Sequence, residues 1–228
     1  MTRAAPSTGA AIATLISVTL LRLVRGKALW FGASFAAVPV AFTAVMRVLG
    51  VAPFLDDIFI VWRLLGALLA AMLVGSSIGE EVEDKTGTYL WSRPIARWAV
   101  LAGKLGALAP VVVSLGLVSW CAATVAWTRT APAAASCASL LASSAAACAV
   151  AAGIACLVPR HALALTIGYL LVDDFAGALP FSVRQLTIAN HAGAIAERSG
   201  TATAALAITA IAGVWLALGA WRIRQLEV

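Results

Sequence analysis

Charged residues are scarce in this chain, and their scarcity excludes an ordinary soluble domain. Asp, Glu, Lys and Arg make up 11% of the 228 residues, whereas hydrophobic residues make up 62%. A typical globular chain has about a quarter charged residues and about half apolar ones. Because about 20 apolar residues cross a bilayer as a helix, about six crossings would use most of the chain. We therefore predict an all-α integral membrane protein that forms one transmembrane domain over residues 1–228.

Nucleotide-binding and catalytic motifs are also missing. The two Gly-Lys pairs, Gly26-Lys27 and Gly103-Lys104, lack the earlier Gly and the following Ser or Thr of a P-loop. No HExxH or GxSxG sequence occurs. We therefore predict a chain that is not an enzyme. It cannot hydrolyse ATP by P-loop chemistry, so energy of that kind has to come from a partner.

Histidine and cysteine are too few and too scattered for a metal centre. The two histidines, His161 and His191, are expected on opposite faces of the membrane, which makes a shared zinc site implausible. The four cysteines lie in or beside apolar runs, and none has metal-ligand spacing with a histidine. They are interpreted as small apolar side chains. We predict no metal site and no cofactor bound by this chain itself.

The apolar runs predict six membrane spans. They cover residues 28–49, 58–79, 99–120, 134–158, 161–180 and 202–221. The fourth span consists almost wholly of small residues, which allow helices to approach closely, so we expect it inside the bundle. Before the first span, residues 11–27 have apolar side chains at helical spacing and end in three bases. They predict an amphipathic helix on the inner membrane surface. The alternative is the start of one long first span.

The basic residues predict the orientation. Eleven of the 16 Lys and Arg residues fall on one side of this topology, which is the cytoplasmic side by the positive-inside rule. Both termini are then cytoplasmic. The bases are spread over several loops rather than gathered on one face, so nucleic acid is not expected as a partner. The bases on the expected cytoplasmic side are Arg3, Arg22, Arg25, Lys27, Lys85, Arg93, Arg97, Lys104, Arg160, Arg222 and Arg224.

One long polar stretch, residues 78–104, separates the second and third spans. Four carboxylates come first, and four bases follow. Gly87 favours a bend, and Pro94 suits the first turn of a new helix. Between them we predict a short helix over residues 88–91, whose apolar side chains cover the membrane surface or fill a groove in a partner. The simpler alternative is an ordinary basic loop with a tryptophan at the interface.

The pattern E-x-E-D-x-T-x-T-Y-L-x-S-R-P-x-x-R, with a Lys seven residues later, resembles the cytoplasmic loop of ABC transporter permeases of the ABC-2 type. In that family the loop carries a coupling helix that docks into a separate ATPase subunit. The matching residues are Glu81, Glu83, Asp84, Thr86, Arg93, Pro94, Arg97 and Lys104, and the short helix would add Thr88, Tyr89, Leu90 and Trp91. The family also places an elbow helix before the first span and short re-entrant outer helices before the last one, here residues 180–200.

The resemblance implies the transmembrane subunit of an ATP-driven exporter in a bacterial inner membrane. Two copies of the chain, or this chain and a similar one, would form the substrate pathway. ATP and Mg would be bound by the partner ATPase. A membrane scaffold or anchor is the alternative, but that role does not explain the pattern in residues 78–104.

Two adjacent aspartates, Asp173 and Asp174, lie in the predicted fifth span, where a buried carboxylate costs about 2.5–3.5 kcal/mol or more. In one interpretation the helix unwinds there and the carboxylates face the substrate path, with Arg63 as a further candidate. In the other they cap a helix end and pair with Arg184. An intramembrane enzyme using both aspartates is less favoured, because the chain has no second acidic cluster to hold a diphosphate.

Overall fold

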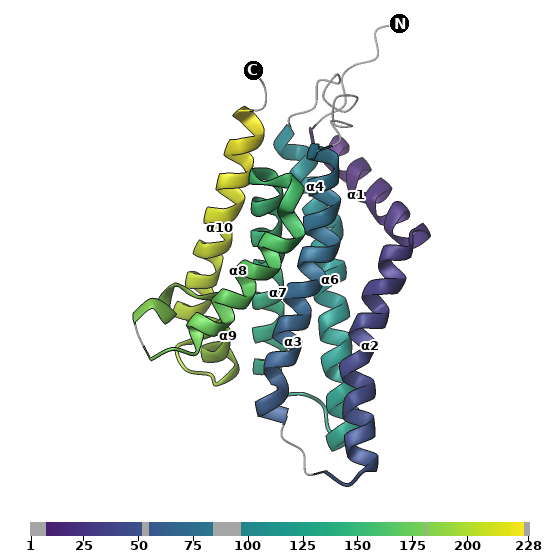
Figure 1. Cartoon of the computed structure of the whole chain (residues 1–228), viewed down its shortest axis with the longest axis vertical. Coiled ribbons are helices and arrows are strands. Elements are labelled where there is room, and N and C mark those ends of the chain that lie inside the picture. The colour runs from purple at the N-terminus through teal and green to yellow at the C-terminus, as the bar shows by residue number, and fades with distance from the viewer. Residues whose placement is uncertain (1–7, 52–54, 84–96, 181, 226–228) are drawn as a thin grey trace, which may run out of the picture.

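The computed structural model describes residues 8–51, 55–83, 97–180 and 182–225, and over these ranges it contains helices and no strands (Figure 1). The predicted all-α class is confirmed. The helices are α1 (Thr8–Arg25), α2 (Lys27–Val48), α3 (Leu55–Leu69), the π-helix η1 (Ala70–Gly75), α4 (Ser76–Glu83), α6 (Arg97–Thr128), α7 (Ala134–Leu157), the 3-10 helix η2 (Pro159–His161), α8 (Ala162–Gly177), the 3-10 helix η3 (Ser182–Leu186), α9 (Ile188–Ala196) and α10 (Thr201–Gln225).

Six of the described helices are long and apolar enough to cross a membrane, so the protein is a multi-pass membrane protein. They are α1, α2, the continuous helix over residues 59–80, α6, α7 and α10. The number agrees with the prediction, but the membership differs. The predicted fifth span, 161–180, is realised as α8, which has only 16 residues. The helix α1, predicted to lie on the surface, has the length and apolar composition of a span.

The centre of the bundle is α7, and its small residues explain its position. Of the 18 most apolar consecutive residues in each helix, 78% are buried in α7, compared with 22% in α2 and 17% in α10. A Cβ atom on Gly153 would lie 2.6 Å from the carbonyl oxygen of Trp215, so α10 passes directly over this glycine. Gly219 approaches Gly153 one turn further along α10. The prediction that this helix is buried in the bundle is confirmed.

The long helix that follows α2 is continuous from α3 through η1 into α4, but its middle section is a π-helix instead of an α-helix. Residues 70–75 form a π-helix, and most of its side chains are buried among neighbouring helices. Its first half, α3, is fixed by aromatic packing, in which Trp62 meets Trp120 of α6 edge to face at 5.0 Å between ring centroids. The Trp62 indole N–H donates to Ser119 Oγ, and that hydroxyl donates to the Ala36 carbonyl of α2. These contacts join α2, α3 and α6.

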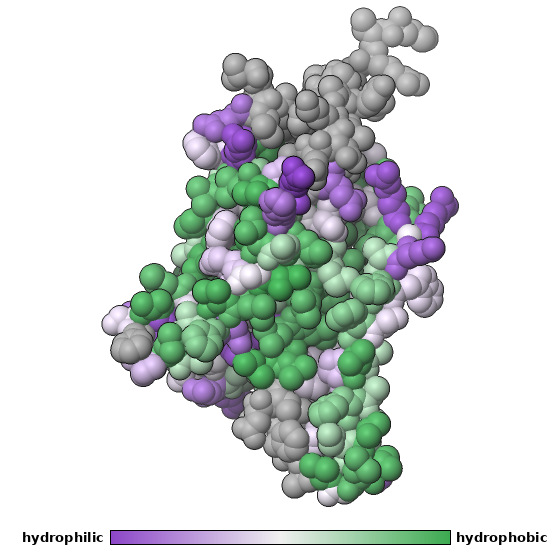
Figure 2. Space-filling view, viewed as in Figure 1, coloured by the Kyte–Doolittle hydropathy of each residue, from purple (hydrophilic) through white to green (hydrophobic). Residues whose placement is uncertain are grey.

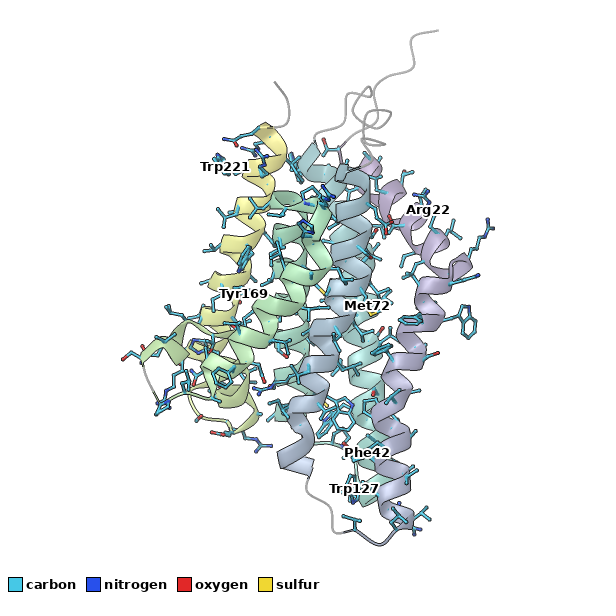
Figure 3. All side chains as sticks on the ribbon, viewed as in Figure 1. Arg22, Phe42, Met72, Trp127, Tyr169 and Trp221 are labelled. Atoms are coloured by element: carbon cyan, nitrogen blue, oxygen red, sulfur yellow. The ribbon has the colours of Figure 1, made fainter. Side chains whose placement is uncertain are left out.

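The ends of the helices lie at two opposite ends of the bundle. In Figure 1, the start of α1, the end of α4, the start of α6 and the end of α10 lie at the upper end. The end of α2 and the connection after α6 lie at the lower end. Figure 3 places Arg22 and Trp221 in the upper part and Trp127 near the lower end. The short helix α9 lies beside the lower half of α7 and above the lower ends of α2 and α6.

Candidate functional site

The strongest polar cluster joins α3, α8 and α9, and its first member is Asp173 on α8. The helix α8 runs without interruption from Ala162 to Gly177, so the aspartates do not stand at an unwound segment. Asp173 is 8% exposed. Its two carboxylate oxygens accept hydrogen bonds from the backbone N–H groups of Ile188 and Ala189, both at 3.0 Å. These are the first two amides of α9.

This contact follows from the physics of a helix start. The first N–H groups of an α-helix have no partner within the helix, and the aligned peptide dipoles make that end positive. A carboxylate supplies both the missing acceptor and the opposite charge. Thr187 completes the start of α9, because its side chain accepts from Asn190 N at 3.3 Å. Asp173 therefore fixes α9 against α8, although 15 residues separate it from the first amide it binds.

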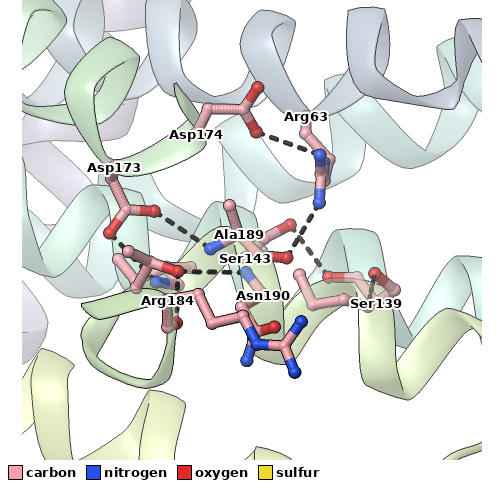
Figure 4. A network of polar contacts seen from close by, with 11 residues as sticks. Arg63, Ser139, Ser143, Asp173, Asp174, Arg184, Ala189 and Asn190 are labelled. Carbon is pink, nitrogen blue, oxygen red and sulfur yellow. Dashed lines mark hydrogen bonds and ion pairs between the residues drawn. The ribbon is translucent and has the colours of Figure 1, made fainter. Parts of the chain in front are cut away.

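Asp174, the adjacent residue, pairs with Arg63 of α3. One guanidinium nitrogen lies 3.0 Å from Asp174 Oδ1, and the other donates to the Ala189 carbonyl at 2.9 Å (Figure 4). The two side chains are only 18% and 13% exposed. Arg63 thus connects α3 to α8 and α9 at once. Charge-assisted bonds of this kind are about twice as strong as neutral ones.

Two interpretations of the aspartate pair follow from the sequence, and the structure supports only the capping part of the second. The proposed unwinding of the helix at Asp173 is wrong, whereas the proposed capping of a helix end is confirmed, with α9 as the capped helix. The expected pairing with Arg184 is also wrong among the described residues, because Asp174 pairs with Arg63. Arg63 lies on the neighbouring helix with its guanidinium directed at Asp174, so Arg63 is the base that neutralises this carboxylate (Figure 4).

A cavity of about 410 Å³ lies beside this cluster. Its polar lining comes from Arg63, Asp174, Arg184, Asn190, Glu197 and Ser199. The sequence did not single out Asn190, Glu197 or Ser199 as lining residues. They come from α9 and the turn after it, and only the position of α9 beside α3 and α8 brings them to the two aspartates. A possible signal was Thr187, a residue type that commonly begins a helix.

A smaller cavity of about 30 Å³ lies behind the ion pair and is lined in part by Arg63, Asp173, Asp174 and Ser143. Within the described residues the Nε atom of Arg63 is buried without a hydrogen-bond partner in the protein. A space of this size and polarity fits one water molecule. The arrangement at this end of the bundle therefore offers fixed charges next to a space for a polar molecule.

The described residues of the ABC-2-like pattern belong to α4 and α6, at the opposite end of the bundle. Asp84, Thr86, Thr88, Tyr89, Leu90, Trp91, Arg93 and Pro94 lie outside the described residues. Glu81 and Glu83 belong to the last turns of α4, and Arg97 is the first residue of α6. Within the predicted polar stretch 78–104, the described parts are therefore helical extensions of the two flanking spans.

Lys104 is the one member of that pattern whose side chain is described. It is 6% exposed, and its Nζ donates to the Ser77 carbonyl at 2.6 Å. The Ser77 hydroxyl lies 3.4 Å from the same nitrogen. This lysine thus ties α6 to α4 just where the two helices lead into residues 84–96.

The metal-ligating residue types are scattered in the part of the chain that the structure describes. No group of three or more His, Cys, Asp or Glu side chains there could hold a metal ion. His161 lies in η2, and His191 lies on α9, where its Nε2 atom is 2.8 Å from the Gln185 carbonyl oxygen. Both aspartate carboxylates are held by partners within the protein.

Comparison with known proteins places the chain in no family. No protein-family model matches it, and no curated protein matches it as a relative.

Proposed function

We propose that this chain is the transmembrane permease subunit of an ATP-driven ABC exporter of the ABC-2 type. The observation that carries the proposal is the patterned stretch from Glu81 to Lys104, which joins the two helices that Lys104 holds together. The six long apolar helices agree with a pathway-forming membrane subunit. The chain has no P-loop, so two copies of a partner ATPase would bind ATP and Mg beneath it.

In this proposal the start of α1, the end of α10 and residues 84–96 face the cytoplasm of a bacterial inner membrane. The short helix around residues 88–91 docks into the ATPase, with Glu81, Glu83, Arg93 and Arg97 making ion pairs. Closure of the ATPase pair on ATP pushes on this helix. Because α4 and α6 are tied together by Lys104 and Ser77, they would move as one body.

The substrate pathway would form where two copies meet. The helix α1 would be the elbow helix, α8 would serve as the fifth of six crossings, and η3 with α9 would form the outer re-entrant part. In this orientation Arg63, Asp173 and Asp174 would lie toward the outer end, near the 410 Å³ cavity, where a polar substrate would be released. A conformational change at the docking helix performs transport only if the partner ATPase binds the two states with different affinity.

A membrane scaffold is the second class of function, and the same experiment separates the two. The chain would be purified from its native membrane after reversible crosslinking, and the eluate assayed for a bound ATPase. We expect an ATPase with the wild-type chain and with Arg160→Glu. Arg160 is an exposed base at the same end of the bundle, outside the pattern. We expect loss of the ATPase when Glu83→Lys and Arg93→Glu are combined. A chain that elutes without an ATPase in every case would favour a scaffold.

A further inference from the structure

The bend between α1 and α2 carries a cavity that no part of the proposed transport cycle uses. It has a volume of about 480 Å³ and is lined by Val18, Leu21, Arg22, Arg25 and Gly26. The chain turns at Gly26, whose backbone is extended (φ −85°, ψ 165°), directly after its N–H has made the last α-helical bond of α1, to the Arg22 carbonyl at 2.8 Å. Figure 2 shows a hydrophilic patch at this bend, on the right of the view, next to hydrophobic surface.

The charged residues at this bend are all basic. Arg25 and Lys27 are exposed and flank Gly26, whereas Arg22 also interacts within the chain. No Asp or Glu occurs before Asp56, so neither α1 nor α2 offers a compensating carboxylate. The helix α6, against which both pack, contains no acidic residue either. Arg25 and Lys27 are therefore the two bases that the bend presents on its surface.

The length of α2 fits a bend that lies at a membrane surface. The 22 residues of α2 rise by about 33 Å, close to the roughly 30 Å of a bilayer's hydrocarbon core. Lys27 begins α2 and Arg47 lies at its far end, as expected for a helix whose ends meet the headgroups. Beside the bases, the apolar side chains of Val18, Leu21 and Trp30 are each about half exposed or more.

From these observations we infer that the α1–α2 bend is a binding site for an anionic phospholipid. The phosphate group lies at the cavity against Arg25, whose guanidinium presents a planar set of donors that matches phosphate oxygens. Lys27, two residues further along the chain, adds a second exposed positive charge at the bend. The glycerol and the first acyl carbons lie against Val18 and Leu21. Basic clusters on amphipathic helices attract anionic headgroups through the same charges. The inference requires only that the chain sits in a membrane, not that it transports.

The test uses the full chain in a neutral detergent, with bound dioleoyl phosphatidylglycerol counted by native mass spectrometry. Each base near an anionic surface is worth about fivefold in affinity, so we expect Arg25→Gln with Lys27→Gln to weaken binding about 25-fold. The matched control is Arg222→Gln with Arg224→Gln, which removes two bases at the inner end of α10. We expect less than about a twofold change there. Equal losses in the two variants would overturn the inference, since they would indicate unspecific attraction to any basic helix end.

A second variant distinguishes binding that depends on the shape of the cavity from simple attraction to surface charge. Leu21→Trp keeps every base and fills the cavity, and Leu21 is exposed enough to accept the larger side chain. We expect it to weaken binding about as much as removing one base does. Unchanged binding in Leu21→Trp would contradict the proposed cavity. This variant also carries the test if the charge variant does not fold, which circular dichroism would report.

The source of the phosphate is tested with soluble competitors. Glycerol phosphate and inorganic phosphate share the headgroup chemistry but lack acyl chains, so we expect neither to displace the lipid at equal concentration. Neutral phosphatidylcholine should bind at least about tenfold more weakly than phosphatidylglycerol. Displacement by glycerol phosphate would mean a site for a soluble phosphate compound and would overturn the lipid assignment.

Discussion

Two regions of the bundle are held together in opposite ways. Where α7 crosses α10, small residues bring the backbones into contact, and the closest approach is between Gly153 and Trp215. Where α3, α8 and α9 meet, the helices are held together by the charged side chains of Arg63, Asp173 and Asp174. In a membrane neither region gains from excluding water in the way a soluble core does, so close packing and buried polar bonds replace it. The first region should be sensitive to size and the second to charge.

The largest effect is expected at the charged region. Arg63→Ala would leave the Asp174 carboxylate without its cation, and removing one partner of a buried pair costs about 3–5 kcal/mol. Thermal unfolding in detergent measures this loss of stability. Replacing both partners, as Arg63→Met with Asp174→Leu, should recover most of it because no charge stays buried alone. A double variant as unstable as Arg63→Ala would show that the ion pair is not what Arg63 contributes.

The size-sensitive region gives the second prediction. Gly153→Leu would force a side chain against the backbone of α10, and overpacking of this kind costs about 1–3 kcal/mol. We expect the upper end of that range, since the obstructing atom is a carbonyl oxygen at 2.6 Å from the added Cβ. Gly213→Leu is the matched control on α10, where nothing lies within 4 Å of an added Cβ. The two variants should differ clearly in unfolding temperature, and similar values would contradict the close crossing.

A smaller effect is expected at the start of α9. Thr187→Ala removes the side-chain acceptor for Asn190 N, and loss of such a cap costs about 1 kcal/mol. Asp173 still holds the first two amides, so α9 should loosen without leaving α8. Hydrogen exchange should rise at Asn190 while Ile188 and Ala189 stay protected. Equal loss of protection at all three amides would mean that Thr187, rather than Asp173, organises this end.

The sequence predicted the helices better than their contacts, for a physical reason. Length and apolar composition define a span, so α2, α7 and α10 begin and end within a few residues of the predicted limits. The expectation of a 20-residue fifth span was wrong because α8 ends at Gly177, before Pro180. The burial of α7 was predictable, since its small residues serve only a close contact.

The partners of the aspartates were not predictable in the same way. Asp173 and Asp174 stand out as carboxylates in an apolar run, but which groups neutralise them depends on how three helices meet. The contact between Asp173 and the start of α9 requires the chain to turn back beside α8 after Leu179. Likewise, the π-helix at residues 70–75 has no signal in the sequence that we identified. Residues 84–96 carry the pattern on which the proposed function depends, and they lie outside the described ranges.

The central claim is that residues 81–104 couple this chain to an ATPase, and ATP hydrolysis by the co-purified complex in liposomes tests it most directly. We expect Glu83→Lys to reduce the ATPase activity that depends on this chain at least about tenfold, while the unfolding temperature of the bundle stays within a few degrees of wild type. Arg160→Glu should leave the activity unchanged. Undiminished activity of the Glu83→Lys complex, with the ATPase still bound, would contradict the claim.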